Sequence, residues 1–251
     1  MADTFGQWLT PLGEIKQDEV LDDLQFDSLG VLQRKGDYCF TSDAVLLANF
    51  AEVHAKDRVV ELCAGSGVVS VIVAAKRHPR EIVAVELDPA AADRCARTVA
   101  LDRLTDIVKV WQGDAKDAPK ALGTGFDAVL ANPPYYPLGI GEMPSDPSVA
   151  MGRFEVALTL PELVASSSRL LRYGGRLYLV HLASRAAELL SLMREEGIEP
   201  KTMYVVSPSK EAPADVVLVE GRKGGKTGLT VRSFVREDLQ KEYYRRDGEE
   251  E

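Results

Sequence analysis

Short apolar runs alternate along this chain with longer amphipathic or alanine-rich stretches. The short runs are rich in Val, Ile, Leu and Ala, which is typical of strands buried on both faces of a sheet. They occupy residues 58–63, 81–86, 107–112, 126–131 and 176–181. The longer stretches have the length and end signals of helices, which we expect over residues 44–50, 68–76, 89–102, 160–171 and 184–196. Strands that alternate with helices predict an α/β fold with a mainly parallel sheet.

Two further apolar runs, residues 202–206 and 215–220, close the pattern. The stretch between them contains prolines and is too short for a helical crossover, so we expect these last two strands to pair antiparallel. Closer to the N-terminus, residues 29–33 and 36–40 have the pattern of two short strands joined by a turn.

Composition and charge limit the domain organisation. The chain has 251 residues, of which 45% are hydrophobic, and a formal net charge of -9. This balance excludes a uniformly basic surface, so any nucleic-acid-binding surface must be local. We expect an acidic N-terminal arm at residues 1–35, an α/β domain at 36–236 and a charged tail at 237–251. Inside the domain, the Gly- and Pro-rich stretch 136–154 is typical of a functional lid or a disordered loop.

Cysteine spacing and hydropathy exclude several classes of protein. Cys39, Cys63 and Cys95 show no metal-ligand spacing and cannot form an even set of disulfides, which indicates a reducing compartment. The N-terminus shows no signal peptide, and the longest apolar run, residues 68–75, is too short to span a bilayer. We therefore expect a cytoplasmic protein with neither a membrane segment nor a metal site.

A glycine turn follows the first of the main apolar runs. Gly65 and Gly67 would let the backbone approach a ligand beside a helix N-terminus. A dinucleotide-binding turn would have a third glycine where this chain has Ser70, and Glu61 would repel a pyrophosphate. A carboxylate at that strand end suits the ammonium group of an amino acid instead. The turn therefore disfavours an NAD-dependent oxidoreductase.

Two neighbouring strands also end in carboxylates. Glu86 could accept hydrogen bonds from both hydroxyls of a ribose, and Asp114 could accept one from an adenine amino group. An amino acid, a ribose and an adenine together describe S-adenosylmethionine. The candidate cofactor-binding residues are Ser42, Asp43, Glu61, Ala64, Gly65, Gly67, Glu86, Leu87, Asp114, Ala115 and Asn132. Helix capping would explain Ser42 and Asp43 equally well.

The tetrapeptide Asn132-Pro133-Pro134-Tyr135 ends the fourth main strand in a rigid corner, because two prolines have no N–H to continue a sheet. Open α/β sheets bind ligands at this edge, and the corner could clamp a flat, amino-bearing group. We expect the Asn132 side-chain oxygen and the Pro133 carbonyl to accept from the amino group, and Tyr135 to stack on its ring. The candidate catalytic residues are thus Asn132, Pro133, Pro134 and Tyr135. No side chain is an obvious base, and a structural role suits His181 better than catalysis.

These motifs resemble the class I S-adenosylmethionine-dependent methyltransferases over about residues 36–220. The resemblance implies a Rossmann-like, seven-stranded, mostly parallel sheet with an antiparallel last strand. Asn-Pro-Pro-Tyr is similar to the motif of amino methyltransferases, which act on adenine N6, guanine N2 or a glutamine amide. Residues 22–33 and 40–50 most resemble bacterial valine-tRNA (adenine-N6) methyltransferases, which implies tRNA as the partner. Arg153-Phe154-Glu155 stands where those relatives have Arg-His-Glu, and Phe154 removes a possible proton acceptor.

A tRNA substrate would need a local basic surface. Residues 221–236 contain five Lys and Arg residues and no acidic residue, so we expect phosphate contacts there. The candidate substrate-binding residues are Tyr135, Arg153, Arg222 and Lys223.

Two alternatives remain open at this point. An N5-glutamine methyltransferase of release factors shares Asn-Pro-Pro-Tyr, but such enzymes usually carry a helical front domain, for which residues 1–35 are too few. A non-catalytic S-adenosylmethionine- or RNA-binding protein would have no need of the acceptors at the corner. A DNA adenine methyltransferase would normally need a target-recognition domain that the chain has no room for.

Overall fold

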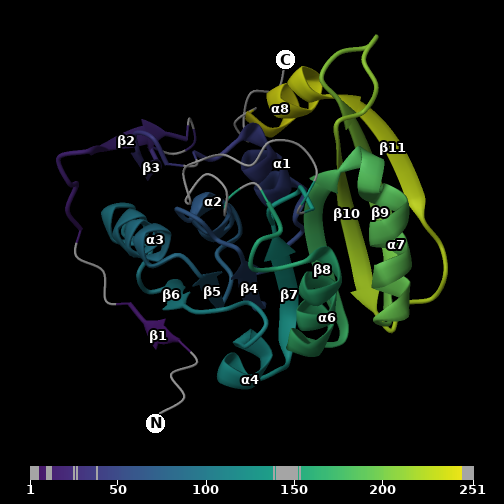
Figure 1. Ribbon diagram of the computed structural model, residues 1–251, viewed down its shortest axis with the longest axis horizontal. Coiled ribbons are helices and arrows are strands. Elements are labelled where there is room, and N and C mark those ends of the chain that lie inside the picture. The colour runs from purple at the N-terminus through teal and green to yellow at the C-terminus, as the bar shows by residue number, and fades with distance from the viewer. Residues whose placement is uncertain are drawn as a thin grey trace.

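A nine-stranded sheet with helices on both faces forms the centre of the computed structural model (Figure 1). The structure describes residues 6–9, 13–24, 26, 28–37, 39–137, 139, 152 and 154–244, and side chains as far as residue 241. Within these residues the strand order is β1-β6-β5-β4-β7-β8-β10-β9-β11.

Five parallel strands make up the part of the sheet that the apolar runs predicted. They are β4 (Arg58–Leu62), β5 (Glu81–Glu86), β6 (Val108–Gln112), β7 (Phe126–Ala131) and β8 (Leu171–Leu182). Each pairs in parallel with its neighbours in the order β6-β5-β4-β7-β8. Their carboxyl ends therefore lie along one edge of the sheet, as the α/β interpretation requires.

The other end of the sheet contains the expected antiparallel strand. β10 (Val216–Lys223) runs between β8 and β9 (Ile198–Ser207) and is antiparallel to both. This confirms a mostly parallel sheet with an antiparallel last strand. Two edge strands were not predicted: β1 (Gln7–Trp8), antiparallel to β6, and β11 (Thr230–Val235), parallel to β9. Both are largely exposed, so neither shows the apolar run typical of a central strand.

Helices cover each face of the sheet over a separate hydrophobic core. One core packs under α1 (Ser42–Phe50), α2 (Val68–Arg77) and α3 (Pro89–Leu101), and the other under α4 (Ala118–Leu122), α6 (Leu160–Leu170) and α7 (Ala186–Glu195). A short 3-10 helix, η1 (Ala183–Arg185), precedes α7. No helix among the described residues is long and apolar enough to cross a membrane.

The first helical turns show why two of these helices begin where they do. In α3 the Asp88 side chain accepts hydrogen bonds from the N–H groups of Ala90 and Ala91, with Pro89 at the first helical position. In α6 Thr159 and Glu162 form a reciprocal capping box. The first of these caps starts α3 directly after β5, and the second starts α6 after the long stretch that follows β7.

The described part of the N-terminal segment packs on the domain instead of hanging loose. β2 (Glu19–Asp23) and β3 (Gly30–Arg34) form an antiparallel hairpin whose backbone bonds to α3, through Leu32 N–H to Thr98 Oγ1 at 3.1 Å. Residues 36–40, expected as a second strand, do not form one where they are described.

The last described element was also unexpected. The chain turns at Arg236 into α8 (Arg236–Tyr244), which packs beside α1 with Leu239 buried beneath it. The domain boundaries at residues 35 and 236 stay a prediction, but β3 and Leu239 both belong to the core.

Candidate active site

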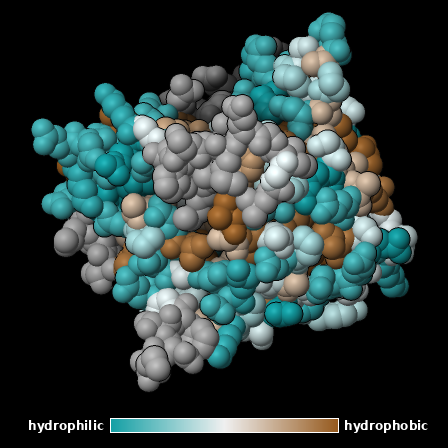
Figure 2. Space-filling view, viewed as in Figure 1, coloured by the Kyte–Doolittle hydropathy of each residue, from teal (hydrophilic) through white to brown (hydrophobic). Residues whose placement is uncertain are grey.

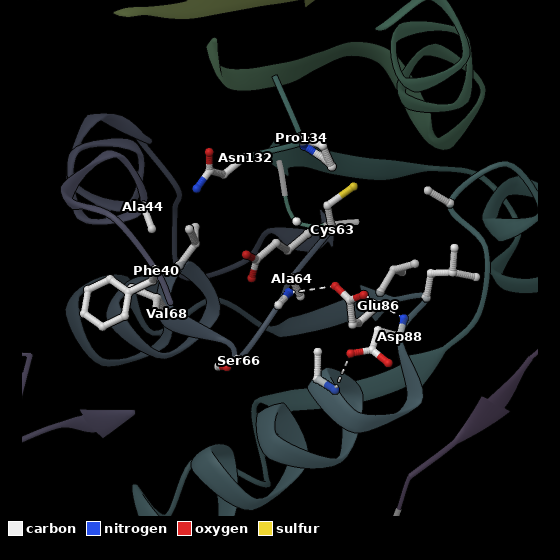
Figure 3. A pocket seen from close by; sticks show the side chains of 18 of the residues that line it. Phe40, Ala44, Cys63, Ala64, Ser66, Val68, Glu86, Asp88, Asn132 and Pro134 are labelled. Carbon is white, nitrogen blue, oxygen red and sulfur yellow. Dashed lines mark hydrogen bonds between the residues drawn. The ribbon is translucent and has the colours of Figure 1, made fainter. Parts of the chain in front are cut away.

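A pocket opens at the carboxyl edge of the parallel strands (Figure 3). It collects side chains from the ends of β4, β5, β6 and β7 and from α1, α2 and α3. Of the residues proposed from the sequence, it is lined by Glu61, Ala64, Gly65, Glu86, Leu87, Asp114, Ala115, Asn132 and Pro134. The structure thus brings the three strand-end carboxylates and the Asn-Pro-Pro-Tyr corner to one cavity.

The two glycines of the turn after β4 have different surroundings, one facing the pocket and the other packed against α3. Gly65 has a φ of +55°, and a Cβ built there would meet nothing within 4 Å, so its backbone faces open space in the pocket. Gly67 has a φ of +93°, and a Cβ there would come within 2.8 Å of Cys95 Sγ on α3. Gly67 therefore permits helix packing and does not line the pocket.

Glu61 is the most buried of the three carboxylates, with 1% of its surface exposed. Burial raises its pKa to about 8, although a hydrogen bond from the Ser70 hydroxyl acts against that rise. Ser70 occupies the position of the absent third glycine, and here it fixes the Glu61 carboxyl group. A cationic ligand group would relieve the cost of ionising Glu61 in this buried place.

The other two carboxylates are held by their own turns. Glu86 accepts hydrogen bonds from the N–H of Gly65 and the N–H of Asp88, both at 2.8 Å, and burial raises its pKa. Asp114 accepts from the N–H of Lys116 at 2.9 Å and lies 3.4 Å from its ammonium nitrogen. Each carboxylate has an oxygen fixed by backbone, which orients the group toward the pocket (Figure 3 for Glu86).

This donor set fits S-adenosylmethionine. Three acid groups spaced along adjacent strand ends can accept from an ammonium group, a ribose and an adenine amino group. A pyrophosphate would meet three acid groups at once, and its negative charge would not relieve the cost of ionising any of them. No group of metal-ligating side chains occurs among the residues that the structure describes.

The corner at residues 132–135 is held by hydrogen bonds on both sides. The Tyr135 hydroxyl lies 2.7 Å from Asn132 Oδ1 and 3.2 Å from Asp43 Oδ2. The Tyr135 carbonyl accepts from Arg185 at 3.1 Å, and Arg185 also forms a buried ion pair with Glu155. Asn132 and Pro134 face the cavity, Pro133 is buried, and Tyr135 supports the corner from behind.

Ser42 and Asp43 do not line the pocket, unlike their neighbour Ala44. Neither caps α1, because Thr41 holds the cap position and makes no side-chain cap bond. Both side chains bond Arg236 instead, Ser42 Oγ at 2.8 Å and Asp43 Oδ1 at 2.5 Å. No sequence pattern pairs residues so far apart.

Arg222 and Lys223 lie far from the pocket. β10 is antiparallel to β8, and Arg222 pairs with Arg176, which lies in register with Ala128 of β7 and Val59 near the amino end of β4, away from the pocket. The Lys223 ammonium group donates to the carbonyls of Ser168 and Leu171, the latter at 2.9 Å. The structure therefore does not join these two residues to the cavity, and Arg153 lies outside the described residues.

His181 lies behind the corner and is fully buried, its ring 5.2 Å from that of Tyr135. Its Nδ1 accepts from the Leu182 N–H at 2.9 Å, and burial lowers its pKa to about 4. The imidazole is therefore neutral near pH 7 with Nδ1 already occupied. This is the environment of a packed side chain and not of a general base.

Several pocket residues had no signal in the sequence. Cys63, at the end of β4, has a φ of +60° and a thiol whose pKa is raised by burial, so it stays protonated. Gln33 and Arg94 reach the cavity because the β2–β3 hairpin packs on α3. Tyr136 does not line the pocket; it is 38% exposed, and its ring lies 5.7 Å from that of Phe154. The other unpredicted lining residues are Phe40, Ala44, Ser66, Val68, Val69, Val85, Asp88, Ala91, Gly113, Gly152, Ala157 and Leu158.

Comparison with known families and proteins gives consistent results. Residues 39–197 match the family model described as methyltransferase small domain. The chain is 31% identical over 184 residues to a tRNA1(Val) (adenine(37)-N6)-methyltransferase of Aeromonas salmonicida, covering 72% of this chain and 75% of the relative. It is 36% identical over 145 residues to a 4-amino-L-phenylalanine/4-methylamino-L-phenylalanine methyltransferase of Streptomyces pristinaespiralis, covering 55% and 48%.

The fold has relatives among solved structures. The crystal structure of M. jannaschii TYW2 in complex with AdoMet superposes with a TM-score of 0.57 and 15% identity, covering 83% of this chain and 87% of that one. At that identity the likeness establishes the shared architecture alone.

Proposed function

The chain belongs to the methyltransferase small domain family, and we propose that it transfers a methyl group from S-adenosylmethionine to the N6 amino group of an adenine in tRNA, beside the anticodon. One observation carries this proposal: Asn132 and Pro134 line the same cavity as Glu61, Glu86 and Asp114. A methyl donor held by the three carboxylates would lie next to an acceptor group held by the corner.

Each of three carboxyl groups would bind a different part of the cofactor. Glu61 would accept from its ammonium group, Glu86 from its ribose hydroxyls and Asp114 from its adenine. Gly65, whose backbone is open to the cavity, allows close approach. When bound, the cofactor supplies a methyl group on a positively charged sulfur. The protein's own contribution is to hold, orient and desolvate the acceptor.

An adenine amino group is a poor nucleophile because its lone pair is delocalised into the ring. The Asn132 side-chain oxygen and the Pro133 carbonyl would each accept one amino N–H and draw the nitrogen toward a tetrahedral geometry. Each such bond contributes on the order of 1 kcal/mol in an ordinary setting, and more in a dry site where charge develops. Tyr135, which the motif suggested as a stacking platform, does not line the cavity, and its hydroxyl would instead hold the Asn132 oxygen in place. Positioning alone can supply roughly 7–11 kcal/mol, so a strong base is not required.

The choice of tRNA adenine rests on the relatives more than on the cavity. The Aeromonas salmonicida relative acts on adenine 37 of a valine tRNA, as its name states, and it matches nearly three quarters of this chain. The Streptomyces pristinaespiralis relative methylates an aromatic amine of an amino acid, as its name states. In both cases the methyl group goes to an amino group on a flat ring. Such an amino group can donate two hydrogen bonds, which suits the two fixed carbonyl oxygens of the corner. An anticodon-loop base is also single-stranded, so extruding it costs less than opening a duplex.

The proposal can be tested by incubating the protein with methyl-labelled S-adenosylmethionine and, separately, total tRNA, a release factor, duplex DNA or 4-aminophenylalanine. We expect label in tRNA alone, recovered as N6-methyladenosine after digestion to nucleosides. Label in release factor or in the free amino acid would replace the proposed acceptor. An absence of label from every acceptor, with cofactor binding retained, would favour a non-catalytic binding protein.

A further inference from the structure

We propose that Arg236 is a positioning residue for methyl transfer: it occupies Asp43 and so directs the Tyr135 hydroxyl proton onto the Asn132 carboxamide oxygen. This inference rests on the proposed function of Asn132. Four side chains form the Arg236–Asn132 chain, in the order Arg236, Asp43, Tyr135 and Asn132. The successive contacts are 2.5 Å, 3.2 Å and 2.7 Å.

In this hydrogen-bonded series of side chains, the Tyr135 hydroxyl can donate to either of two acceptors. The Tyr135 hydroxyl has one proton but lies within hydrogen-bonding distance of both Asp43 Oδ2 and Asn132 Oδ1. The shorter distance is to Asn132. A carboxylate is ordinarily the stronger acceptor, because hydrogen bonds to a charged group are roughly twice as strong as neutral ones. Something must therefore weaken Asp43 as an acceptor.

Arg236 provides that effect. Its guanidinium group donates to Asp43 Oδ1 at 2.5 Å, and only 18% of the Arg236 side chain and 10% of the Asp43 side chain are exposed. A partly buried ion pair neutralises the carboxylate locally, since water screens it little. The proton of Tyr135 then goes to the neutral carboxamide, which fixes the Asn132 oxygen. A carbonyl oxygen has two lone pairs, so Oδ1 can still accept from a substrate amino group.

Loss of Arg236 should reverse this arrangement. An unpaired, buried Asp43 carboxylate would take the Tyr135 proton, and the phenol oxygen would then be an acceptor only. The carboxamide of Asn132 satisfies an acceptor by turning its NH₂ group toward it. That rotation would present N–H donors where the substrate amino group also presents donors. Arg236 thus acts on the orientation of Asn132 without touching the pocket, of which it is not a lining residue.

The position of Arg236 in the fold supports a dedicated role. It is the first residue of α8, and Leu239 of that helix is buried against the core that also includes α1. A second ion pair at 2.7 Å joins Arg236 to Asp215 in the connection between β9 and β10, but 42% of the Asp215 side chain is exposed. Surface pairs of that kind contribute little, so Asp215 is a matched control for Asp43.

The decisive experiment compares Arg236→Gln, Asp43→Asn, the Arg236→Gln/Asp43→Asn double variant and Asp215→Asn. We expect Arg236→Gln to lower kcat for transfer of the labelled methyl group to tRNA roughly tenfold with an unchanged S-adenosylmethionine Kd. The double variant should recover to within about threefold of the wild type, because a neutral carboxamide at position 43 cannot outcompete Asn132 for the proton. Asp215→Asn should stay within about twofold. Additive losses in the double variant, or a parallel loss of cofactor affinity, would overturn the inference.

A second readout needs no substrate and separates this inference from the proposed function. The Asn132 side-chain NH₂ resonance is identified by its absence in Asn132→Ala. It should shift in Arg236→Gln and return in the double variant, and Tyr135→Phe should remove the effect of Arg236→Gln altogether. If Arg236→Gln fails to fold, the same comparison with Arg236→Met, which also removes the positive charge, keeps the test. A resonance that does not respond to position 236 refutes the inference, even if tRNA is methylated.

Discussion

The two halves of the site are built in different ways. The cofactor side consists of strand ends and the turns that follow them, and each carboxylate is fixed by nearby groups, as Glu86 is by Gly65 and Asp88. The acceptor side is centred on residues 132–135 but is held by side chains from α1, η1 and α8. One half is local in sequence and the other is assembled from the whole chain.

This difference predicts how each half should respond to change. A substitution on the cofactor side should weaken binding of S-adenosylmethionine and leave the rate at saturation nearly intact. A substitution on the acceptor side should lower the rate and leave binding nearly intact. On the face that Figure 2 presents, hydrophilic residues predominate, and hydrophobic residues gather near the centre and along the right side.

The largest effect is expected at Asn132. Asn132→Ala removes an acceptor that strengthens as charge develops on the amino group, so we expect a fall of roughly 10²–10³-fold in the single-turnover rate. The Kd for S-adenosylmethionine, measured by calorimetry, should change less than about threefold. Asn49→Ala on α1 is a matched control, because Asn49 bonds Lys76 and lies outside the pocket. A rate within a few-fold of the wild type would remove Asn132 from the chemistry.

Glu86 should give the opposite pattern. Glu86→Ala loses the ribose contacts and both backbone bonds that shape the glycine turn, so we expect cofactor Kd to rise by about 10–100-fold. Equilibrium dialysis with labelled cofactor measures this directly. Glu81→Ala, at the other end of β5, loses only a half-exposed pair with Arg58 and should bind normally. Equal effects of the two substitutions would contradict the division.

Glu61 links the cofactor side to pH. Its pKa is about 8 in the folded protein against 4.5 for the free side chain, so the folded state holds more protons between those values. Stability from this group is complete below about pH 4.5 and is lost as pH rises toward 8. As pH rises from 6.0 to 7.5, the free energy of unfolding of the wild type should therefore fall by about 2 kcal/mol relative to that of Glu61→Gln. Urea unfolding at the two pH values measures this difference.

Cofactor binding should reverse that protonation. An ammonium group beside Glu61 favours the carboxylate, so binding near pH 7 should release a proton from Glu61. Calorimetry in two buffers of different ionisation enthalpy should detect the release in the wild type and a smaller one in Glu61→Gln. Identical proton release in both proteins would place the ammonium group elsewhere.

The smallest effect concerns the basic residues at the opposite edge. The Lys223 ammonium group bonds carbonyls at the end of α6, so Lys223→Ala should cost about 1 kcal/mol of stability. Methylation and the salt dependence of tRNA binding should stay unchanged, with the exposed Lys226→Ala as the control. If tRNA affinity depended less steeply on salt concentration in Lys223→Ala than in the wild type, Lys223 would contact phosphate as the sequence suggested.

The same division separates what the sequence could predict from what it could not. The bounds of β5 and β7 agree with the apolar runs, and the carboxylates at the strand ends meet in one pocket, because parallel strands with short turns fix that geometry locally. The Ser70–Glu61 hydrogen bond was also within reach, since a strand–turn–helix unit brings its two ends together. The prediction considered Ser70 only as an absent glycine and so missed this bond.

The remaining features depend on distant contacts. Asp43 and Arg236 are separated by 193 residues, and no periodicity joins them. β11 and α8 have polar, exposed faces, so their pattern did not differ from that of a tail. Arg222 and Lys223 were proposed by charge alone, and only the register of β10 against β8 shows which edge they occupy.

The placement of Arg236 at the start of α8 has a consequence for biosynthesis. Synthesis runs from the N-terminus, so β4, β5, β6 and β7 emerge from the ribosome well before Arg236. A nascent chain can therefore acquire its cofactor pocket while Asp43 still lacks its counter-ion. If α8 docks after the strands have paired, the protein becomes competent to bind its methyl donor before its acceptor side is fully oriented.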